Sequence, residues 1–192
     1  PERTLGNEAD DLFKSMRNYM ESDDPFSFKS LSFSSKKTDI KKFKRPTRKN
    51  EILVSTIIAD NEAASVEKCI NSLGVKAKVK KYLHFEIDAT DGLDINTIVS
   101  TDVLFNPSKE YIANIEEGSG VYRFLVRSKD DIVGQSLAQT LQDRFNLSGL
   151  KSIKKGVVWE VKINSARIKK DVDLILNSHI FSNPISQECH EY

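Results

Sequence analysis

The chain has 192 residues, of which 39% are hydrophobic and 30% charged, and its formal net charge is +1. This composition is typical of a soluble globular protein, and the near-neutral charge argues against a general affinity for nucleic acid or anionic membranes. The two cysteines, Cys69 and Cys189, lack CxxC spacing and predict a reducing, cytoplasmic environment without a disulfide framework. No apolar run approaches the roughly 20 residues that a membrane helix requires.

The first 50 residues differ in composition from the rest. Glu8–Met20 has the spacing of a helix that ends at Asp23-Asp24-Pro25. Pro25–Asn50 then contains nine lysines and arginines but one acidic residue, Asp39. We expect residues 1–50 to form a helix followed by a basic linker or arm.

Residues 51–192 read as two successive units, 51–117 and 118–192, each with the order strand, helix, strand, helix, short strand. The first unit has predicted strands at Ile52–Ile58, Val79–Ile87 and Glu110–Ile115, and predicted helices from Asp60 or Asn61 to Gly74 and at Asp94–Phe105. The second has predicted strands at Val121–Arg127, Ile153–Ile163 and Gln187–Tyr192, and predicted helices at Val133–Phe145 and Lys170–Phe181. We expect an α+β fold of two β-α-β-α-β units, joined at Glu116–Gly120, with antiparallel sheets and helices on one face.

Three features carry specific expectations about burial. Helical spacing predicts that the buried stripe of the first long helix consists of Val66, Cys69, Ile70 and Leu73. The corresponding stripe in the second unit consists of Val133, Leu137, Leu141 and Phe145. His84 falls on the polar face of its strand, which predicts a structural or solvated role.

The two units repeat one pattern of residues. Lys80-Lys81 before an apolar run corresponds to Lys154-Lys155 before another. Asn106-Pro107 recurs as Asn183-Pro184, 77 residues later, and the apolar positions of the preceding helices keep that same offset. A period near 70 residues with two copies predicts two small units docked as pseudo-two-fold partners rather than a solenoid.

No catalytic constellation is evident. The three histidines, His84, His179 and His190, are not at metal-ligand spacing with cysteine or with one another. Gly118-Ser119-Gly120 precedes a strand rather than a helix, which is the wrong order for a phosphate-binding loop. We therefore predict no catalytic residue, no metal and no cofactor.

The order of motifs in the second unit resembles the PurS family, the small subunit of phosphoribosylformylglycinamidine (FGAM) synthase in purine biosynthesis. The matching motifs are Asp131-Ile132-Val133-Gly134 at the first helix, Lys155-Gly156 in the second strand and Phe181-Ser182-Asn183-Pro184 after the last helix. The first unit matches at Leu104-Phe105-Asn106-Pro107. It lacks the helix glycine and has Tyr82 in place of the strand glycine.

This resemblance implies a non-catalytic subunit that bridges a glutaminase (PurQ-like) and an ATP-dependent synthetase (PurL-like) and supports ammonia transfer. Related proteins pair as two copies, so this chain resembles a dimer fused into one polypeptide. It would be an accessory subunit of a glutamine-dependent ligase, without activity alone. The candidate partner-interface residues are Asp131, Gly134, Lys155, Gly156, Asn106, Pro107, Asn183 and Pro184.

Two other readings stay open at this point. A tandem ACT-like domain that senses a small molecule is also built from strand–helix–strand units. A nucleic-acid-binding module could use the basic arm at Lys36–Lys49, although the neutral overall charge argues against it. Self-association is also left open.

Overall fold

A computed structural model describes residues 40–44, 50–115 and 118–192. The described residues all belong to one compact unit, Lys37–Tyr192. The predicted helix at Glu8–Met20 and most of the basic arm lie outside the described residues.

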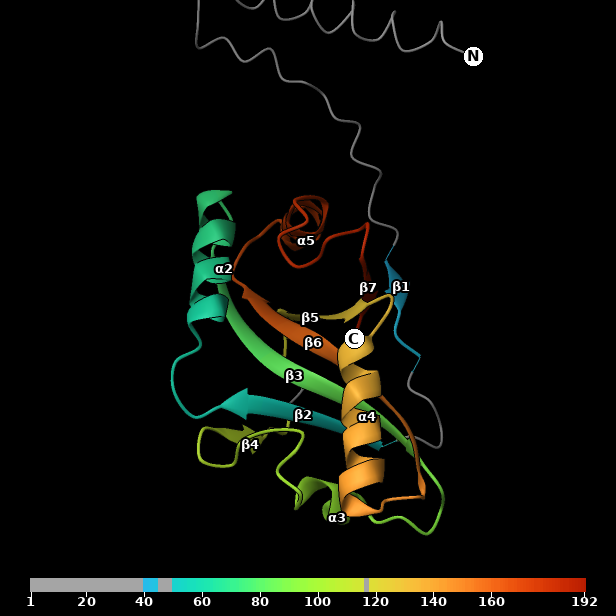
Figure 1. The fold of residues 1–192 in the computed structure, drawn as a ribbon. Helices are drawn as coiled ribbons and strands as arrows, with labels where there is room; N and C mark the ends of the chain where they lie inside the picture. Colours follow the sequence, from blue (N-terminus) through green and yellow to red (C-terminus); the bar gives the residue numbers. More distant parts are fainter. Residues whose placement is uncertain (1–39, 45–49, 116–117) are drawn as a thin grey trace, which may run out of the picture. The chain divides into compact units, whose positions relative to one another are not determined.

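Seven strands form one sheet in the order β1-β7-β5-β6-β3-β2-β4 (Figure 1). The elements are β1 (Lys41–Lys42), β2 (Asn50–Thr56), α2 (Asn61–Ser72), β3 (Ala77–Ala89), α3 (Ile95–Val99), β4 (Glu110–Ile112), β5 (Val121–Ser128), α4 (Ile132–Phe145), β6 (Leu150–Ile163), α5 (Ile168–Asn177) and β7 (Gln187–Glu191). Neighbouring strands are antiparallel except β1 and β7, which are parallel. The predicted α+β class is confirmed.

The long strands β3 and β6 lie side by side in the middle of the sheet. They pair from Ala77 with Ile163 to Ala89 with Leu150. Outward from this pair, residues 50–115 (the first half) continue as β3-β2-β4, and residues 118–192 (the second half) continue as β6-β5-β7. This matched order is the one expected for pseudo-two-fold partners. Both halves therefore belong to one sheet. That they arose by duplication remains a prediction from the sequence.

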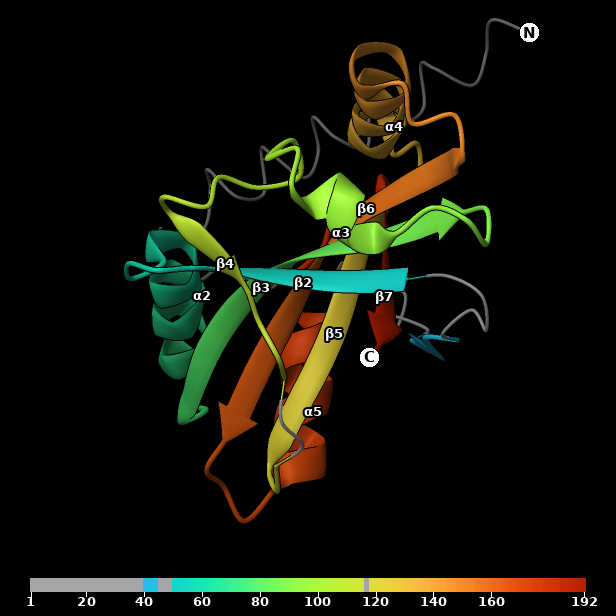
Figure 2. The same ribbon diagram turned by 90° about the horizontal axis from the view of Figure 1, so that it is seen from below.

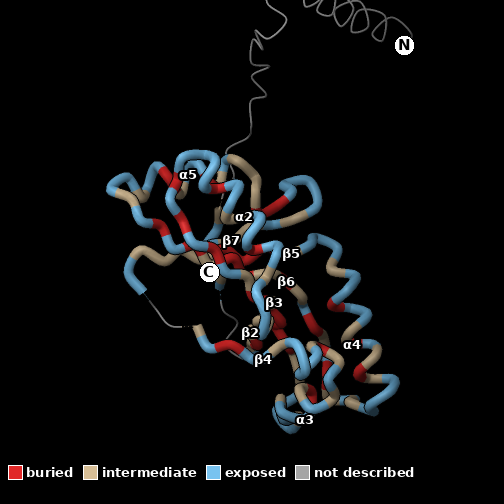
Figure 3. The backbone as a smooth tube through the Cα atoms, turned by 90° about the vertical axis from the view of Figure 1, so that its left-hand side faces the viewer, coloured by how far each residue is buried: buried red, intermediate tan, exposed pale blue. Residues whose placement is uncertain are grey.

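The helices pack on one face of the sheet, and each apolar cluster there uses both halves. Figure 3 shows buried residues along the central strands. In one cluster, Ala63 and Ile70 of α2 meet Ile175 of α5 over the sheet residue Trp159. In the other, Ile98 of α3 meets Leu141 of α4. Because helices of different halves share each cluster, neither half encloses a core of its own.

The predicted helical stripes are correct at two positions each, because Ile70 and Leu141 are buried and Val66 and Leu137 pack against the core, and wrong at the other two. Cys69 and Leu73 are exposed, and the buried residues of α2 are Ala63 and Ile70. On α4, Val133 and Phe145 are exposed, and the buried residues are Gly134, Ala138 and Leu141. Both helices also bury small residues that the predicted stripes left out, Ala63 on α2 and Ala138 on α4, and these allow close approach to the sheet.

The second helix of each half is shorter than the sequence predicted. The expected helix Asp94–Phe105 ends at Val99, and the expected helix Lys170–Phe181 runs from Ile168 to Asn177. Asp102 and His179, at corresponding positions, have φ angles of 56° and 54°. A left-handed residue cannot continue a right-handed helix, so each helix ends before it.

A smaller apolar cluster lies on the opposite face of the sheet. Tyr82, Leu125 and Val158 of the central strands form its buried base. Ala113 and Ile115, which follow β4, cover this base as the chain crosses in front of the strands in Figure 2. Phe43, next to β1, also packs here, so this part of the basic arm is not simply a solvated linker.

Candidate functional site

The two Asn-Pro loops have the same hydrogen bonds in both halves. The Asn106 N–H donates to Glu110 Oε2 at 2.8 Å, and its side-chain oxygen accepts from the Ser108 N–H at 2.9 Å. In the second half, the Asn183 N–H donates to Gln187 Oε1 at 2.8 Å, and its side-chain oxygen accepts from Ile185 N–H at 3.0 Å. Each asparagine therefore closes a turn that leads from the second helix into the last strand.

Each loop is also tied to the end of the first strand of its half. The Ile57 N–H donates to the Lys109 carbonyl at 2.9 Å, and the Lys129 N–H donates to the Ser186 carbonyl at 3.0 Å. Lys129 Nζ additionally donates to the carbonyls of Pro184 and Ile185, at 3.1 and 2.8 Å. Asn106-Pro107 and Asn183-Pro184 thus lie at corresponding places in different halves, and the structure does not bring the two loops together.

Asp131, Gly134 and Lys155 do come together. Asp131 Oδ1 accepts from the Gly134 N–H at 3.0 Å, and Oδ2 accepts from the Lys155 N–H at 2.9 Å. A Cβ on Gly134 would lie 2.4 Å from Asp131 Oδ2 and 2.5 Å from the Ile153 carbonyl. The glycine therefore allows α4 to approach β6, and Asp131 connects the start of the helix to the strand.

The first half replaces this arrangement with an ion-pair cluster. Asp60 Oδ1 accepts from the N–H groups of Glu62 and Ala63, at 2.8 and 3.0 Å. Lys81, the counterpart of Lys155, uses its side chain and places Nζ 3.4 Å from Asp60 Oδ2 and next to the Glu62 carboxylate. Burial alone would lower the pKa of Lys81, but these carboxylates outweigh it and leave the pKa above its ordinary value. The Lys81 ammonium therefore stays charged.

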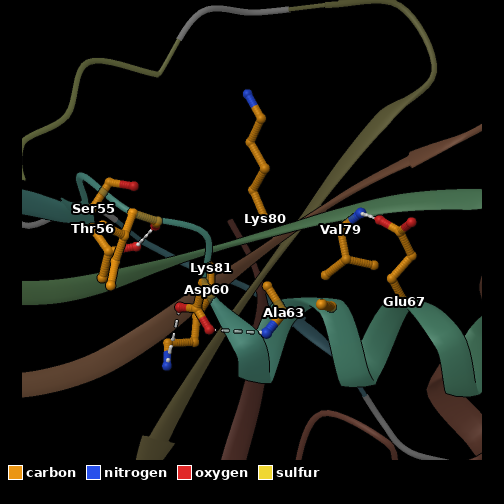
Figure 4. Close-up of a pocket in the computed structure, with 10 residues that line it drawn as sticks. Ser55, Thr56, Asp60, Ala63, Glu67, Val79, Lys80 and Lys81 are labelled. Carbon is orange, nitrogen blue, oxygen red and sulfur yellow. Dashed lines mark hydrogen bonds and ion pairs between the residues drawn. The ribbon is translucent and has the colours of Figure 1, made fainter.

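This cluster borders a hollow of about 270 Å³ between the end of β2, the start of α2 and β3 (Figure 4). Asp60 and Lys81 lie at the helix start, whereas the Lys80 side chain points away from the helix (Figure 4). Glu67 lies at the other end of the hollow, where its carboxylate accepts a hydrogen bond from the Val79 N–H at 3.0 Å. The sequence did not single out this hollow, because its residues come from three separate segments.

Exposed apolar side chains surround the loop region of each half. The first surface consists of Ile57, Ile58, Tyr111 and Ile112, which are 60%, 74%, 50% and 44% exposed. The second surface consists of Ile132, Val133 and Ile185, which are 72%, 51% and 84% exposed. Tyr111 and Ile112 are successive residues of the edge strand β4, so their side chains lie on opposite faces of the sheet edge. Exposed apolar residues gathered in one region are typical of protein-protein contacts. The surfaces occupy corresponding regions but differ in their side chains.

Gly156 belongs to a different feature, on the sheet face opposite the helices. It lies between His84 of β3 and Arg127 of β5 in the register of the sheet. A Cβ at Gly156 would lie 2.9 Å from Leu125 Cδ1 and 3.0 Å from Arg127 Cγ. The missing side chain lets Arg127 pass over β6 and form a 2.8 Å ion pair with Glu86 of β3.

His84 is at the centre of this polar group and is fully buried, so its predicted structural role holds while solvent exposure is wrong. Its Nδ1 lies 3.4 Å from Arg127 Nη2, and its Nε2 lies 3.4 Å from Glu51 Oε1. Arginine can only donate, so Nδ1 accepts a hydrogen bond from Arg127, and the Nε2–H donates one to Glu51 Oε1. Phe43 covers the group, with its ring centroid 4.9 Å from Arg127 Cζ.

Arg127, Glu86 and Glu51 were not predicted as site residues. Charged residues on the polar face of a strand are ordinarily solvated, and the contacts among these three require strands distant in sequence to be adjacent. One signal was present: a glycine in the middle of a strand marks close approach of another group.

Within the described ranges, no group of three or more histidine, cysteine, aspartate or glutamate residues could hold a metal ion. None of the described helices is long and apolar enough to cross a membrane. In sequence comparisons, no family model matches this chain, and no curated protein matches it significantly.

Proposed function

We propose that this chain is a non-catalytic bridging subunit of the PurS kind, which holds a glutaminase and an ATP-dependent synthetase together in an FGAM synthase complex. The observation that carries the proposal is the pair of apolar surfaces at corresponding places in two matched halves. One surface includes Ile58 and the other Ile185, which are the most exposed large apolar residues of their halves.

Matched halves suit a bridge between unlike partners. A two-fold assembly presents the same surface twice, and it can bind only equivalent partners in equivalent ways. Within one chain, each half is free to differ. Here the first surface includes an aromatic residue, Tyr111, whereas the second consists of the aliphatic residues Ile132, Val133 and Ile185.

The continuous sheet supports the same role. A bridge has to keep its two docking surfaces at a constant separation, since ammonia transfer depends on aligned partners. The β3–β6 pairing extends over 13 residues of β3, and the apolar clusters are shared between halves. Covalent linkage also keeps both surfaces together at high effective concentration.

The test is reconstitution with separately purified glutaminase and synthetase subunits of FGAM synthase. We expect glutamine-dependent FGAM synthesis to require this chain, while ammonia-dependent synthesis by the synthetase does not. If the two subunits use glutamine equally well without the chain, the proposal fails.

Variants in the two apolar surfaces test whether each surface binds a different partner. Ile58→Asp is expected to weaken binding of one partner and Ile185→Asp binding of the other, each by about tenfold or more. Leu174→Asp is the control, because Leu174 is 44% exposed on α5 and outside both surfaces. Loss of both partners in each single variant, or no loss in either, would contradict two separate docking surfaces.

A further inference from the structure

A second hollow, of about 780 Å³, lies where β3 begins and β6 ends. Three lysines border it, namely Lys76, Lys78 and Lys162. Amide and hydroxyl groups supply further hydrogen-bonding partners, and no carboxylate is among the described residues that line it. The lining is therefore rich in donors and positive in charge.

Two of these lysines face each other. Lys78 and Lys162 are direct cross-strand neighbours of the β3–β6 pair. Like charges in this position are unfavourable, by roughly 0.2–1 kcal/mol. The other charged neighbours along these strands are of opposite sign, Lys80 with Glu160 and Glu86 with Lys154. The Lys78–Lys162 pair is thus the exception along β3 and β6, and a bound anion would relieve it.

The charge of the hollow is only partly neutralised. Lys78 Nζ forms an ion pair with Glu67 Oε1 at 2.7 Å. The hydrogen bond from Lys78, with that from the Val79 N–H, lowers the pKa of Glu67, so this carboxylate stays ionised and holds the lysine in place. Lys76 and Lys162 form no ion pair with any described residue. One carboxylate against three lysines leaves about two positive charges.

We propose that this hollow binds a small phosphate monoester. Two net positive charges match the dianionic phosphate group, and ammonium, hydroxyl and amide donors suit its oxygens. A volume of about 780 Å³ lies in the range of small-molecule sites and exceeds what phosphate alone would fill. Ala77, Ile163 and Ile168 add apolar surface for the rest of such a ligand. A nucleic acid is the less favoured occupant, because the positive charge is confined to one hollow.

The test is a titration of the full chain with ribose 5-phosphate, with ribose as the matched uncharged probe, followed by ¹H–¹⁵N NMR. We expect saturable shifts at Gly120, Lys162 and Asn164 with ribose 5-phosphate and none with ribose. The Lys76→Gln, Lys162→Gln double variant is expected to bind about tenfold more weakly. Lys154→Gln, which removes an exposed lysine from the same sheet face, is expected to bind as the parent does.

Three results would overturn the proposal. One is the absence of saturable shifts up to about 10 mM, which is weaker than a millimolar site. Another is a loss of affinity in Lys154→Gln as large as that in the double variant, which would indicate diffuse attraction to surface lysines. The third is a single-stranded oligonucleotide that binds through Lys76 and Lys162 more than tenfold tighter than ribose 5-phosphate, which would assign the hollow to a polymer.

Thermal melting gives an independent measurement. Lys162→Gln removes the like-charge contact and is expected to fold with an unchanged or slightly higher melting temperature. Ribose 5-phosphate should raise the melting temperature of the parent and not that of the double variant. Equal stabilisation of both would contradict the site. The measurements need no partner subunit, so their outcome is separate from that of the bridging proposal.

Discussion

Arg127 on β5 and Glu86 on β3 form an ion pair at 2.8 Å although strand β6 lies between them. The arginine crosses at Gly156, the position in β6 without a side chain. The carboxylate is 4% exposed, and Arg127 Nε is buried without a hydrogen-bond partner. The pair connects strands of both halves on the face opposite the helices.

Because Arg127 passes over β6 at Gly156, we expect Gly156→Ala to destabilise the fold. The added methyl group would lie about 3 Å from Leu125, Arg127 and the Val126 carbonyl, and such overpacking costs about 1–3 kcal/mol. Urea denaturation measures the loss. Gly92→Ala is the control, because nothing lies within 4 Å of a Cβ there. Equal stability of the two variants would show that the sheet relaxes around the methyl group.

The shared clusters predict that neither half folds alone. Separately produced fragments 50–117 and 118–192 lose the helices that the other half supplies over each sheet region. We expect each fragment to lack cooperative unfolding and a 1:1 mixture to recover it, as measured by circular dichroism. Independent folding of either fragment would contradict a shared core.

Asp131 is expected to matter more than an ordinary helix cap. Asp131→Ala removes acceptors for the N–H groups of Gly134 and Lys155. Loss of a cap costs about 1 kcal/mol, and leaving a second donor unpaired adds about 1 kcal/mol or more. Asp94→Ala, which removes the cap of the short helix α3, serves for comparison in urea denaturation and should cost less, because Asp94 accepts from one backbone N–H. Equal costs would mean that the bond to β6 contributes nothing.

Tyr82 predicts a loss of stability at alkaline pH. Burial, with the nearby Glu160 charge, raises the pKa of Tyr82 to about 12. Because the folded state raises this pKa, its contribution is complete below pH 10 and is lost as the pH rises from 10 to about 12. Tyr82→Phe has no such proton, so it should gain about 1–2 kcal/mol relative to the parent between pH 9 and 12. A constant difference in denaturation free energy across this range would disprove the assignment.

The two cysteines are expected to react at different rates. Cys69 is exposed, whereas burial raises the pKa of Cys189 to about 11 despite a hydrogen bond with Ser182. Only roughly 0.1% of Cys189 is then thiolate at pH 8, the reactive form. Iodoacetamide labelling followed by peptide mass spectrometry should modify Cys69 first, and Cys69→Ser should label slowly. Faster modification of Cys189 would indicate that its environment opens.

The amino-acid sequence by itself determined the order of the elements and the turns between them, although helices α3 and α5 end before the predicted Asn-Pro stops. Alternation identified the long strands, and Asn106-Pro107 and Asn183-Pro184 identified turns whose hydrogen bonds correspond in the structure. Asp131 was recognisable as a capping residue from its type and position. These are local signals, because caps, turns and strand alternation depend on neighbours in sequence.

The tertiary structure alone decided which faces are buried and which residues meet. Cys69 and Val133 are as apolar as the buried Ala63 and Ala138, but close helix–sheet approach favours the small residues. Arg127, Glu86 and His84 belong to different strands, and their contact requires that β5, β6 and β3 be adjacent. Strand pairing connects residues distant in sequence, so the joining of both halves in one sheet and the crossing at Gly156 follow only from the folded chain.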